Sequence, residues 1–453
     1  MKLIQSIKNS SAFQNIARIS AGTLAGQVIS VMTIPIFTRM YGAAIIGEHS
    51  FLYSLVMTSE SFSDLGLCYA LMTEKEDTDL METYKTISTF LLGVCILGGA
   101  AAFLYFGFIS PESVQLPLWF TVFFLVVSAF VLQQIRLCST WLNREQKYHI
   151  LMKNPVLNNI CFGVVGLALG LLGFREYGYF VGWLTGKIIT MIHLRRCIPR
   201  GQFTLKPSSF RRVISRNRRF VAYQLPTTIA SSLKGQLPVL LIKQLFGSDV
   251  LGQYAITWKV INIPVNLLGS AIGRVFFSRS SELQRSGKPL GDFAFRNMML
   301  AMKVALLPIC CIMAFGDVAL NLILGPGWQM AGDIIRIVSL YAFFWFLTLS
   351  MEGLTITLNK QHYAMTSALA QMVTITTSMT VGAYVFGSVY VSMFLHTVTF
   401  TAVNIVYFVM LFRAMQAPWK KYLRNVLLCI FFVLGGYLIL RFGLLALGLV
   451  SSL

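Results

Sequence analysis

The chain has 453 residues, of which 56% are hydrophobic and only 12% are charged. Soluble domains carry roughly a quarter charged residues, so this composition predicts a polytopic membrane protein with no length left for a soluble catalytic domain. The formal net charge of +20 would favour nucleic-acid binding on a soluble fold. Here the basic residues gather in alternate loops between apolar runs, so we expect anionic lipids as partners and no nucleic acid.

Apolar runs of roughly 20 residues recur along the chain, as helices that cross a bilayer require. Breaking the runs at charged, glycine and proline clusters predicts thirteen spans, six before and seven after a basic stretch at 195–219. The spans are 16–38, 45–71, 85–109, 116–138, 152–174, 177–195, 219–246, 250–277, 297–320, 332–358, 362–387, 389–412 and 425–450. The last contains Gly435, Gly436 and Arg441, which leaves open whether it is one crossing or a re-entrant pair.

The basic residues also set the expected orientation. Nine Lys or Arg and no acid lie between Arg195 and Arg219, at the joint between the two series of spans. With a cytoplasmic N-terminus, 26 basic residues fall in cytoplasmic segments and 3 in outside loops. This asymmetry is the bias that orients membrane proteins during insertion, so we expect the N-terminus in the cytoplasm.

Two segments 205 residues apart share one pattern. YGAAIIGEHSF (41–51) and FGSDVLGQYAI (246–256) both read aromatic, Gly, two variable residues, two branched or aliphatic residues, Gly and then an acid or amide, and a proline precedes each. An even number of spans separates them, so the copies have the same orientation. This predicts a parallel repeat related by an axis along the membrane normal, with substrate sites between the two halves.

Six blocks together resemble a known family. They are TIPIFTRMYGAAIIGEHSF, SDLGLCYAL, GSDVLGQYAITWKV, SAIGRVFFSRSSELQRSG, GPGWQMAGDIIRIVSLYAF and GLTITLNKQHYAM. Their order and spacing, over roughly residues 10–415, resemble the Wzx-type polysaccharide-export flippases of the multidrug/oligosaccharidyl-lipid/polysaccharide exporter superfamily.

That resemblance implies an all-α polytopic fold of two pseudo-symmetric six-helix lobes around a central cavity. We expect lobes at 1–197 and 219–413, a basic cytoplasmic linker at 198–218, and an amphipathic segment with an additional hydrophobic helix at 414–453. Family members move undecaprenyl-diphosphate-linked oligosaccharide to the outer leaflet of the bacterial cytoplasmic membrane. The resemblance therefore implies a flippase for O-antigen or a related surface polysaccharide. A polysaccharide polymerase and a chain-length regulator are the implied protein partners.

Charged residues inside the spans are the candidate site. A charge at the bilayer centre costs about 2.5–3.5 kcal/mol on insertion scales, so the deep lysines Lys187, Lys234 and Lys259 must face protein, an anion or water. Arg18, Arg274, Lys303 and Arg336 lie near span ends, where they can snorkel. In the family that the chain resembles, spans 1, 2, 7 and 8 line the cavity. The expected diphosphate-binding cations are therefore Arg18, Lys234, Lys259 and Arg274, and internal ion pairing is the alternative.

Glu60 and Asp64 are four residues apart and share one face of the second span. Two neighbouring carboxylates in a poorly solvated site resist being ionised together, so one interpretation is proton coupling. The other is that Asp64 pairs with Arg18 and holds two helices together. We expect no cofactor, and coupling to a H⁺ or Na⁺ gradient stays open.

Four prolines lie inside the spans that would line the cavity. Each removes a backbone donor and bends its helix, which makes them candidate hinges for alternating access. They are Pro35, Pro226, Pro238 and Pro264.

Other functions find less support in the sequence. The eight cysteines form no CxxC pair, so we expect no metal site, and no P-loop, HExxH or GxSxG motif is present. A glycan polymerase or ligase usually has long outside loops, whereas the longest expected here, around 316–331, contains no Lys or Arg. We therefore predict no enzymatic activity, and a drug or small-molecule antiporter of related architecture is the alternative.

Overall fold

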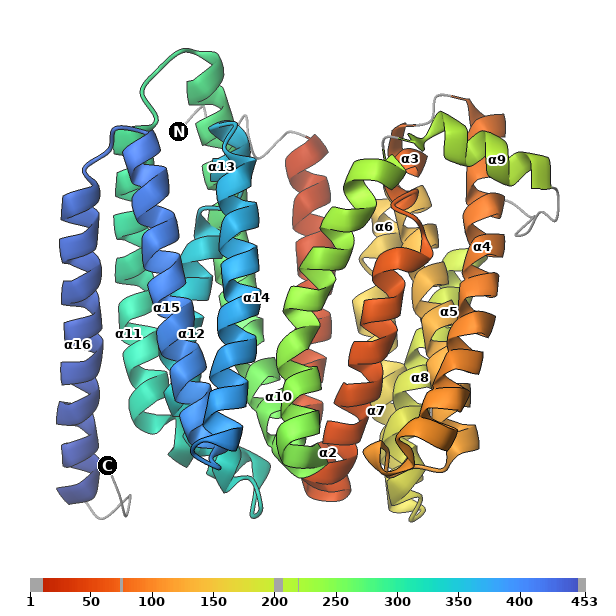
Figure 1. Cartoon of the computed structure of the whole chain (residues 1–453), viewed down its shortest axis with the longest axis horizontal. Coiled ribbons are helices and arrows are strands. Elements are labelled where there is room, and N and C mark those ends of the chain that lie inside the picture. The colour runs from red at the N-terminus through yellow and green to blue at the C-terminus, as the bar shows by residue number, and fades with distance from the viewer. Residues whose placement is uncertain (1–10, 74–75, 199–206, 219, 447–453) are drawn as a thin grey trace. The chain divides into compact units, whose positions relative to one another are not determined.

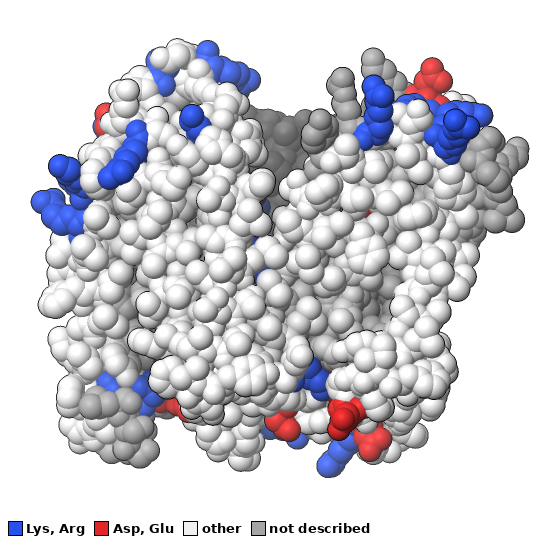
Figure 2. Space-filling view, in the orientation of Figure 1, with Lys and Arg blue, Asp and Glu red and all other residues white. Residues whose placement is uncertain are grey.

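The computed structural model describes residues 11–73, 76–198, 207–218 and 220–446, and all regular structure in these ranges is helical (Figure 1). The chain forms two compact units, Met1–Leu240 and Leu241–Leu453, which are taken in turn below. In each unit, charged side chains visible in Figure 2 gather near the helix ends, and the surface between these ends is almost uncharged. This distribution is that of a protein whose helices cross a bilayer.

Within the described residues, nine helices are long and apolar enough to cross a membrane. Two of them, α2 (Ser11–Ser63) and α10 (Leu225–Arg285), are long helices that bend once. Each of the thirteen predicted spans coincides with a helix or with one arm of a bent helix. The chain is therefore an all-α, multi-pass membrane protein, as its composition predicts.

The bends of α2 and α10 lie at the two copies of the repeat. The residues with non-helical backbone inside these helices are Gly42 (φ 75°, ψ 175°) and Gly247 (φ 86°, ψ −178°), which follow the aromatic residue of each copy. Such backbone conformations are almost restricted to glycine. The four candidate hinge prolines lie inside helical segments, and Pro226 closely follows a π-helical turn, η3 (Phe220–Gln224), the kind of irregularity that accompanies helix kinks.

The first unit continues with α3 (Cys68–Thr73), α4 (Asp77–Leu104), α5 (Leu118–Arg144), α6 (Tyr148–Leu151), α7 (Asn154–Leu171), α8 (Arg175–Arg195) and α9 (Pro207–Arg216). The second arm of α2 ends at Ser63, earlier than the predicted end at residue 71, because the chain turns there before α3. Helices α7 and α8 approach so closely that a Cβ on Gly182 would meet the Gly166 backbone at 2.8 Å. The Tyr41 hydroxyl donates to the Gly166 carbonyl at 2.5 Å, which seats α2 against α7.

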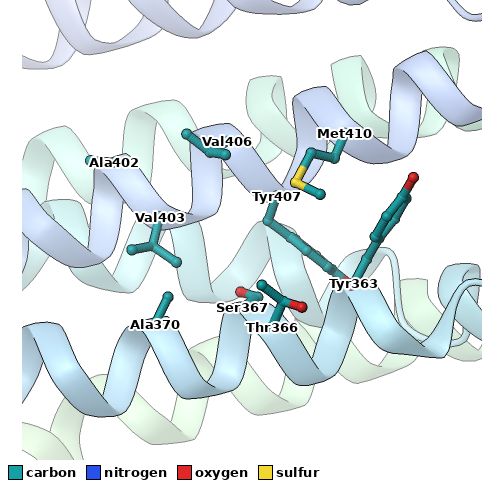
Figure 3. Close-up of a pocket in the computed structure, with 9 residues that line it drawn as sticks. All are labelled: Tyr363, Thr366, Ser367, Ala370, Ala402, Val403, Val406, Tyr407 and Met410. Atoms are coloured by element: carbon teal, nitrogen blue, oxygen red, sulfur yellow. The ribbon is translucent and has the colours of Figure 1, made fainter.

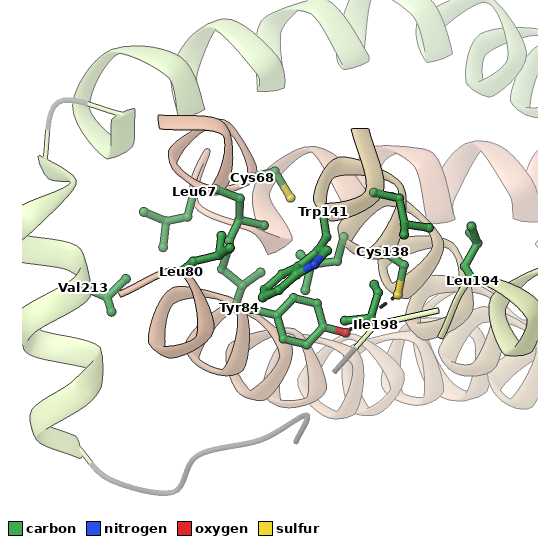
Figure 4. Close-up of a cluster of buried hydrophobic side chains, with 13 residues drawn as sticks. Leu67, Cys68, Leu80, Tyr84, Cys138, Trp141, Leu194, Ile198 and Val213 are labelled. Carbon is green, nitrogen blue, oxygen red and sulfur yellow. Dashed lines mark hydrogen bonds between the residues drawn. The ribbon is translucent and has the colours of Figure 1, made fainter. Parts of the chain in front are cut away.

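Part of the basic joint is a helix docked on the first unit. Helix α9 inserts Val213 into a buried cluster (Figure 4), and its arginines pair with acids at the start of α4. Arg212 lies 3.0 Å from Glu82, and Arg216 lies 2.6 Å from Asp79. The other labelled members of the cluster are Leu67, Cys68, Leu80, Tyr84, Cys138, Trp141, Leu194 and Ile198. The acids between the second and third spans therefore have a structural role that the sequence analysis did not assign.

The division into compact units falls after Leu240, inside α10, so the start of that helix belongs with the first unit. The cytoplasmic linker at 198–218 stays a prediction, and its residues 199–206 lie outside the described residues. Ser232 on α10 donates a hydrogen bond to the Met57 carbonyl on α2 at 3.1 Å.

The second unit contains the rest of α10, then α11 (Gly291–Leu324), α12 (Gln329–Ser350), α13 (Leu354–Thr357), α14 (Gln361–Tyr384), α15 (Val389–Ala414) and α16 (Trp419–Ala446). Two expectations change here. Helix α11 runs to Leu324, so the loop expected around 316–331 shrinks to residues 325–328. Helix α16 is continuous through Gly435 and Gly436, which makes the last hydrophobic segment one helix and not a re-entrant pair.

Helix α16 is attached to the second unit by a buried ion pair. The Arg441 side chain is 2% exposed, and its guanidinium lies 2.7 Å from the Asp317 carboxylate on α11. Arg336 on α12 lies 3.6 Å from the same carboxylate and hydrogen-bonds the Tyr437 hydroxyl. Arg336 is therefore paired inside the protein, whereas the sequence suggested that it snorkels to the interface.

Candidate functional site

Helices α2, α5 and α8 of the first unit bring four charged residues together, which we call the charged tier: Glu60, Asp64, Arg136 and Lys187. Glu60 and Asp64 lie one turn apart at the end of α2. Arg136 on α5 contacts both carboxylates, with Nη1 at 3.6 Å from Glu60 Oε1 and Nη2 at 3.4 Å from Asp64 Oδ2. Charges at this depth require partners of this kind because water is scarce.

The Asp64 side chain is hydrogen-bonded to the backbone of the turn that follows it. It is 1% exposed, and its carboxylate accepts the Gly66 N–H at 3.1 Å and the Cys68 N–H at 3.2 Å. Leu65 and Gly66 adopt positive φ in the turn between α2 and α3, and the carboxylate satisfies the backbone donors of that turn. With Arg136 added, Asp64 has three described partners.

Glu60 is less constrained than Asp64. Its side chain is 16% exposed, and its carboxylate contacts Arg136 at the longer of the two ion-pair distances. Its charge also interacts with Lys187 on α8. Gln133 donates to the Glu60 carbonyl at 2.9 Å and to the Ser63 hydroxyl, which fixes the backbone but leaves the Glu60 carboxylate out of that network. Glu60 thus has two cations near it and no backbone donor among its described contacts.

A group of rings, which we call the aromatic tier, adjoins the charged tier on the same three helices: His49, Tyr53, Phe124, Phe180 and Trp183. The Tyr53 and Trp183 rings meet edge to face with centroids 5.5 Å apart, and the His49 ring lies 5.1 Å from Trp183. The Lys187 ammonium lies 5.5 Å from the centroid of Trp183. The two tiers therefore form one continuous face inside the first unit.

The second unit has a related set of rings but lacks the charged tier. Tyr254 and Trp258 occupy the positions of His49 and Tyr53 in the repeat, and Trp258 stacks on Trp345 with centroids 5.2 Å apart and planes 11° apart. The residues that correspond to Glu60 and Asp64 at the same spacing are Val265 and Gly269.

The four expected diphosphate-binding cations divide between the units. The side chain of Arg18 lies outside the described residues. Lys234 is partly buried on the arm of α10 that belongs to the first unit. In the second unit, Lys259 is partly buried, whereas Arg274 is exposed and lies 3.5 Å from the Ser270 hydroxyl.

The sequence analysis did not identify Arg136 as part of the site. It was counted with the cytoplasmic loops because the predicted span ended at residue 138, but α5 continues to Arg144 and places Arg136 two turns inside the helix. Gln133 and Arg136 are three residues apart and share a face, a pattern that could have indicated a polar contact. Asp64 therefore has Arg136 as its described cation, where the sequence suggested Arg18.

A pocket in the second unit is separate from all these residues. It lies between α14 and α15 and has a volume of about 250 Å³ (Figure 3). Apolar atoms line it almost entirely, with hydroxyl groups toward one end, and its lining residues are Tyr363, Thr366, Ser367, Ala370, Ala402, Val403, Val406, Tyr407 and Met410. None of the candidate cations belongs to it.

The fold defines a class, that of all-α multi-pass membrane proteins. Two solved structures share this fold. Lipid II flippase MurJ in an inward closed conformation is 11% identical with a TM-score of 0.71, over 93% of this chain and 97% of that one. An inward-facing multidrug resistance MATE family transporter of the MOP superfamily is 12% identical with a TM-score of 0.59, over 90% of this chain and 99% of that one.

The family follows from the sequence match. Residues 36–333 match the model of the polysaccharide biosynthesis protein family, so the chain belongs to that family and the resemblance of the six blocks is confirmed. The amylovoran biosynthesis protein AmsL of Erwinia amylovora is 23% identical over 137 residues, which are 30% of this chain and 34% of that protein. The chain thus matches about a third of that relative's length.

Proposed function

We propose that the protein is a flippase for undecaprenyl-diphosphate-linked oligosaccharide repeat units, which it moves from the cytoplasmic to the outer leaflet by alternating access. The observation that carries this proposal is the set of cations at membrane depth in a chain of the polysaccharide biosynthesis family. A diphosphate that leaves the interface loses hydration, and fixed lysine and arginine side chains replace part of it. The proposal includes the cytoplasmic membrane, a cytoplasmic N-terminus and no catalytic reaction.

Within this proposal, Lys234, Lys259, Arg18 and Arg274 contact the diphosphate at different stages of the crossing. Asp64 is a structural residue, because its carboxylate holds the turn before α3. Glu60 is the candidate coupling carboxylate. A proton or a Na⁺ ion that neutralises it would release Arg136 and Lys187 from its charge. A polysaccharide polymerase, a chain-length regulator and anionic lipids are the proposed partners.

The test uses a strain of the source organism that lacks the gene, complemented with single variants. Lys234→Gln should abolish surface polysaccharide and leave lipid-linked repeat units in the membrane, and Lys234→Arg should retain part of the export. Lys303→Gln is the matched control, because Lys303 lies inside α11 but is exposed. Membrane levels of each variant are compared by immunoblot. Full export by Lys234→Gln at normal membrane levels would contradict the role of this cation.

A drug or small-molecule antiporter is the second candidate, favoured by the likeness of the fold to a MATE family transporter. The same deletion strain separates the two functions. The flippase function predicts accumulated lipid-linked repeat units with unchanged drug susceptibility, whereas the antiporter function predicts greater susceptibility with normal surface polysaccharide. The second result would replace our proposal.

The orientation has its own test. Glu112, between α4 and α5, and Lys147, between α5 and α6, lie in consecutive exposed loops of the first unit. In a background without native cysteines, Glu112→Cys should react with an impermeant maleimide in intact cells, and Lys147→Cys should react only after permeabilisation. The reverse pattern would place the N-terminus outside the cytoplasm.

A further inference from the structure

We propose that Tyr53 and Trp183 form a stacking surface for the sugar rings of the transported glycan, with Trp258 and Trp345 as a second such surface in the other unit. This inference rests on the proposed flippase function and adds the residues that contact the glycan. The cations discussed above account for the diphosphate only. The sugar part of the substrate also needs contacts, and the aromatic tier supplies the side chains for them.

The first pair of rings lies beside a charged side chain, near the middle of its helices. Trp183 lies near the middle of α8, and Tyr53 lies near the middle of the second arm of α2. Lys187, one turn beyond Trp183, places its ammonium 5.5 Å from the Trp183 ring and interacts with the charge of Glu60. Because charges at this depth face protein or a water-filled cavity, the rings beside them share that polar environment.

Burial separates these rings from ordinary packing residues. Phe124 and Phe180 are 1% and 0% exposed and fill the interior between α5 and α8. Tyr53 and Trp183 are only partly buried, although Tyr53 lies near the middle of the second arm of α2 and Trp183 near the middle of α8. Each therefore keeps part of its ring available to a ligand, while its other contacts hold the ring in place.

The chemistry of this surface fits a pyranose ring. One face of a pyranose carries C–H groups that pack on an aromatic plane, and its edge carries hydroxyl groups that need hydrogen-bond partners. Tyr and Trp combine an apolar ring with a polar edge, and the Lys187 ammonium lies 5.5 Å from the centroid of the Trp183 ring. A mainly apolar surface with a few placed polar groups is typical of small-ligand sites.

The repeat provides an independent observation. Tyr53 and Trp258 are equivalent positions, each eleven residues beyond the glycine at which its helix bends. In the second unit the Trp258 ring is also partly buried and stacks on the partly buried Trp345, while Tyr341 lies 5.1 Å from Trp258. Partly buried rings therefore occur at the same place in both units.

The experiment measures binding to purified full-length protein in nanodiscs. The probes are geranyl diphosphate and the same isoprenyl diphosphate carrying one glucose, galactose or N-acetylglucosamine. The wild-type protein should bind at least one glycosylated probe more tightly than the bare diphosphate. The variant Trp183→Leu should lower this sugar-dependent ratio about two- to tenfold, the range expected for loss of an aromatic contact. Its affinity for the bare diphosphate should not change.

Two controls keep the result interpretable. Trp119→Leu removes an aromatic side chain of the same unit that is 68% exposed, and it should leave the ratio unchanged. Trp183→Phe keeps a ring and should retain most of the ratio. A wild-type ratio of one for all three sugars, or an unchanged ratio in the Tyr53→Leu/Trp183→Leu double variant, would overturn the inference. Failure of the wild type to bind any diphosphate probe would instead contradict the flippase proposal.

Discussion

The two copies of the repeat share the backbone conformation of the glycine at the bend, but they carry different side chains at the position of Glu48 and Gln253. In the first unit, Glu48 accepts the Gln115 N–H at 3.0 Å and thereby contacts the loop between α4 and α5. In the second unit, Gln253 donates to the Gly327 carbonyl at 2.6 Å and accepts the Ala331 N–H at 3.0 Å, at the loop between α11 and α12. The same side-chain position thus ties each bent helix to the corresponding loop.

Some features occur in both units, whereas the carboxylates of Glu60 and Asp64 belong to the first unit alone. Glycine at the bend and a side-chain contact to the next loop occur in both units, so they belong to the architecture. The carboxylates of Glu60 and Asp64 have Val265 and Gly269 as their counterparts, and Gly269 packs directly against Leu349. Since the second unit folds without these carboxylates, a bent helix of this kind does not need them, which supports a specific role in the first unit.

The largest effect on stability is expected in the second unit, where α16 is attached. Arg441→Leu leaves the Asp317 carboxylate buried with the more distant Arg336, and breaking such a pair costs about 3–5 kcal/mol. Thermal unfolding in detergent should show a strong decrease in Tm. Asp317→Leu combined with Arg441→Leu should recover much of the loss, and an equally unstable double variant would contradict the pairing.

The two bends should respond equally to the same change. Gly42→Ala and Gly247→Ala each force a side chain into a backbone conformation that costs about 1–3 kcal/mol. A Cβ at either position meets nothing within 4 Å, so the cost is conformational and not steric. Equal decreases in Tm would confirm that the repeat is structural in both units, and a neutral result at either glycine would show that its bend can relax.

The sequence allowed the helices, the repeat and the family to be predicted, because apolar length, glycine spacing and motif order are local signals. It did not reveal which partners the buried charges have. Arg136 and Asp64 are 72 positions apart, and their contact depends on how α2 packs on α5. In the sequence, Arg441 left open whether the last span is one crossing. In the structure, Arg441 pairs with Asp317, and this ion pair explains how α16 tolerates a charge. The backbone leaves helical geometry at Gly42 and Gly247, two positions that the sequence marked only as part of the repeat, and the prolines stay candidate hinges.

The two carboxylates of the charged tier should differ in their effect on stability. Asp64→Asn replaces the ion pair with Arg136 by a neutral contact and leaves one oxygen to accept two backbone N–H groups. The expected loss in the free energy of unfolding is about 1–3 kcal/mol. Glu60→Gln weakens the interactions with Arg136 and Lys187 but removes no acceptor of a described backbone N–H, so it should cost less than Asp64→Asn. The measurement is Tm for both variants in the same detergent.

Export assays with membrane levels matched extend this contrast. Glu60→Gln should lose dependence on the ion gradient while the protein remains abundant, and Asp64→Asn should reduce protein abundance. If Glu60→Gln exports normally with gradient dependence intact, Glu60 is not the coupling carboxylate.

The smallest effect is expected when the repeat is made more symmetric at the position of Glu48. Glu48→Gln keeps a carbonyl oxygen that accepts the Gln115 N–H, so the change should stay within about 1 kcal/mol. The reciprocal change, Gln253→Glu, is not equivalent, because a carboxylate cannot donate to the Gly327 carbonyl and would place two acceptors 2.6 Å apart. It should therefore cost more than Glu48→Gln in the same Tm assay. A Glu48→Gln variant less stable than Gln253→Glu would show that the charge of Glu48, and not its acceptor oxygen, is what the first unit uses.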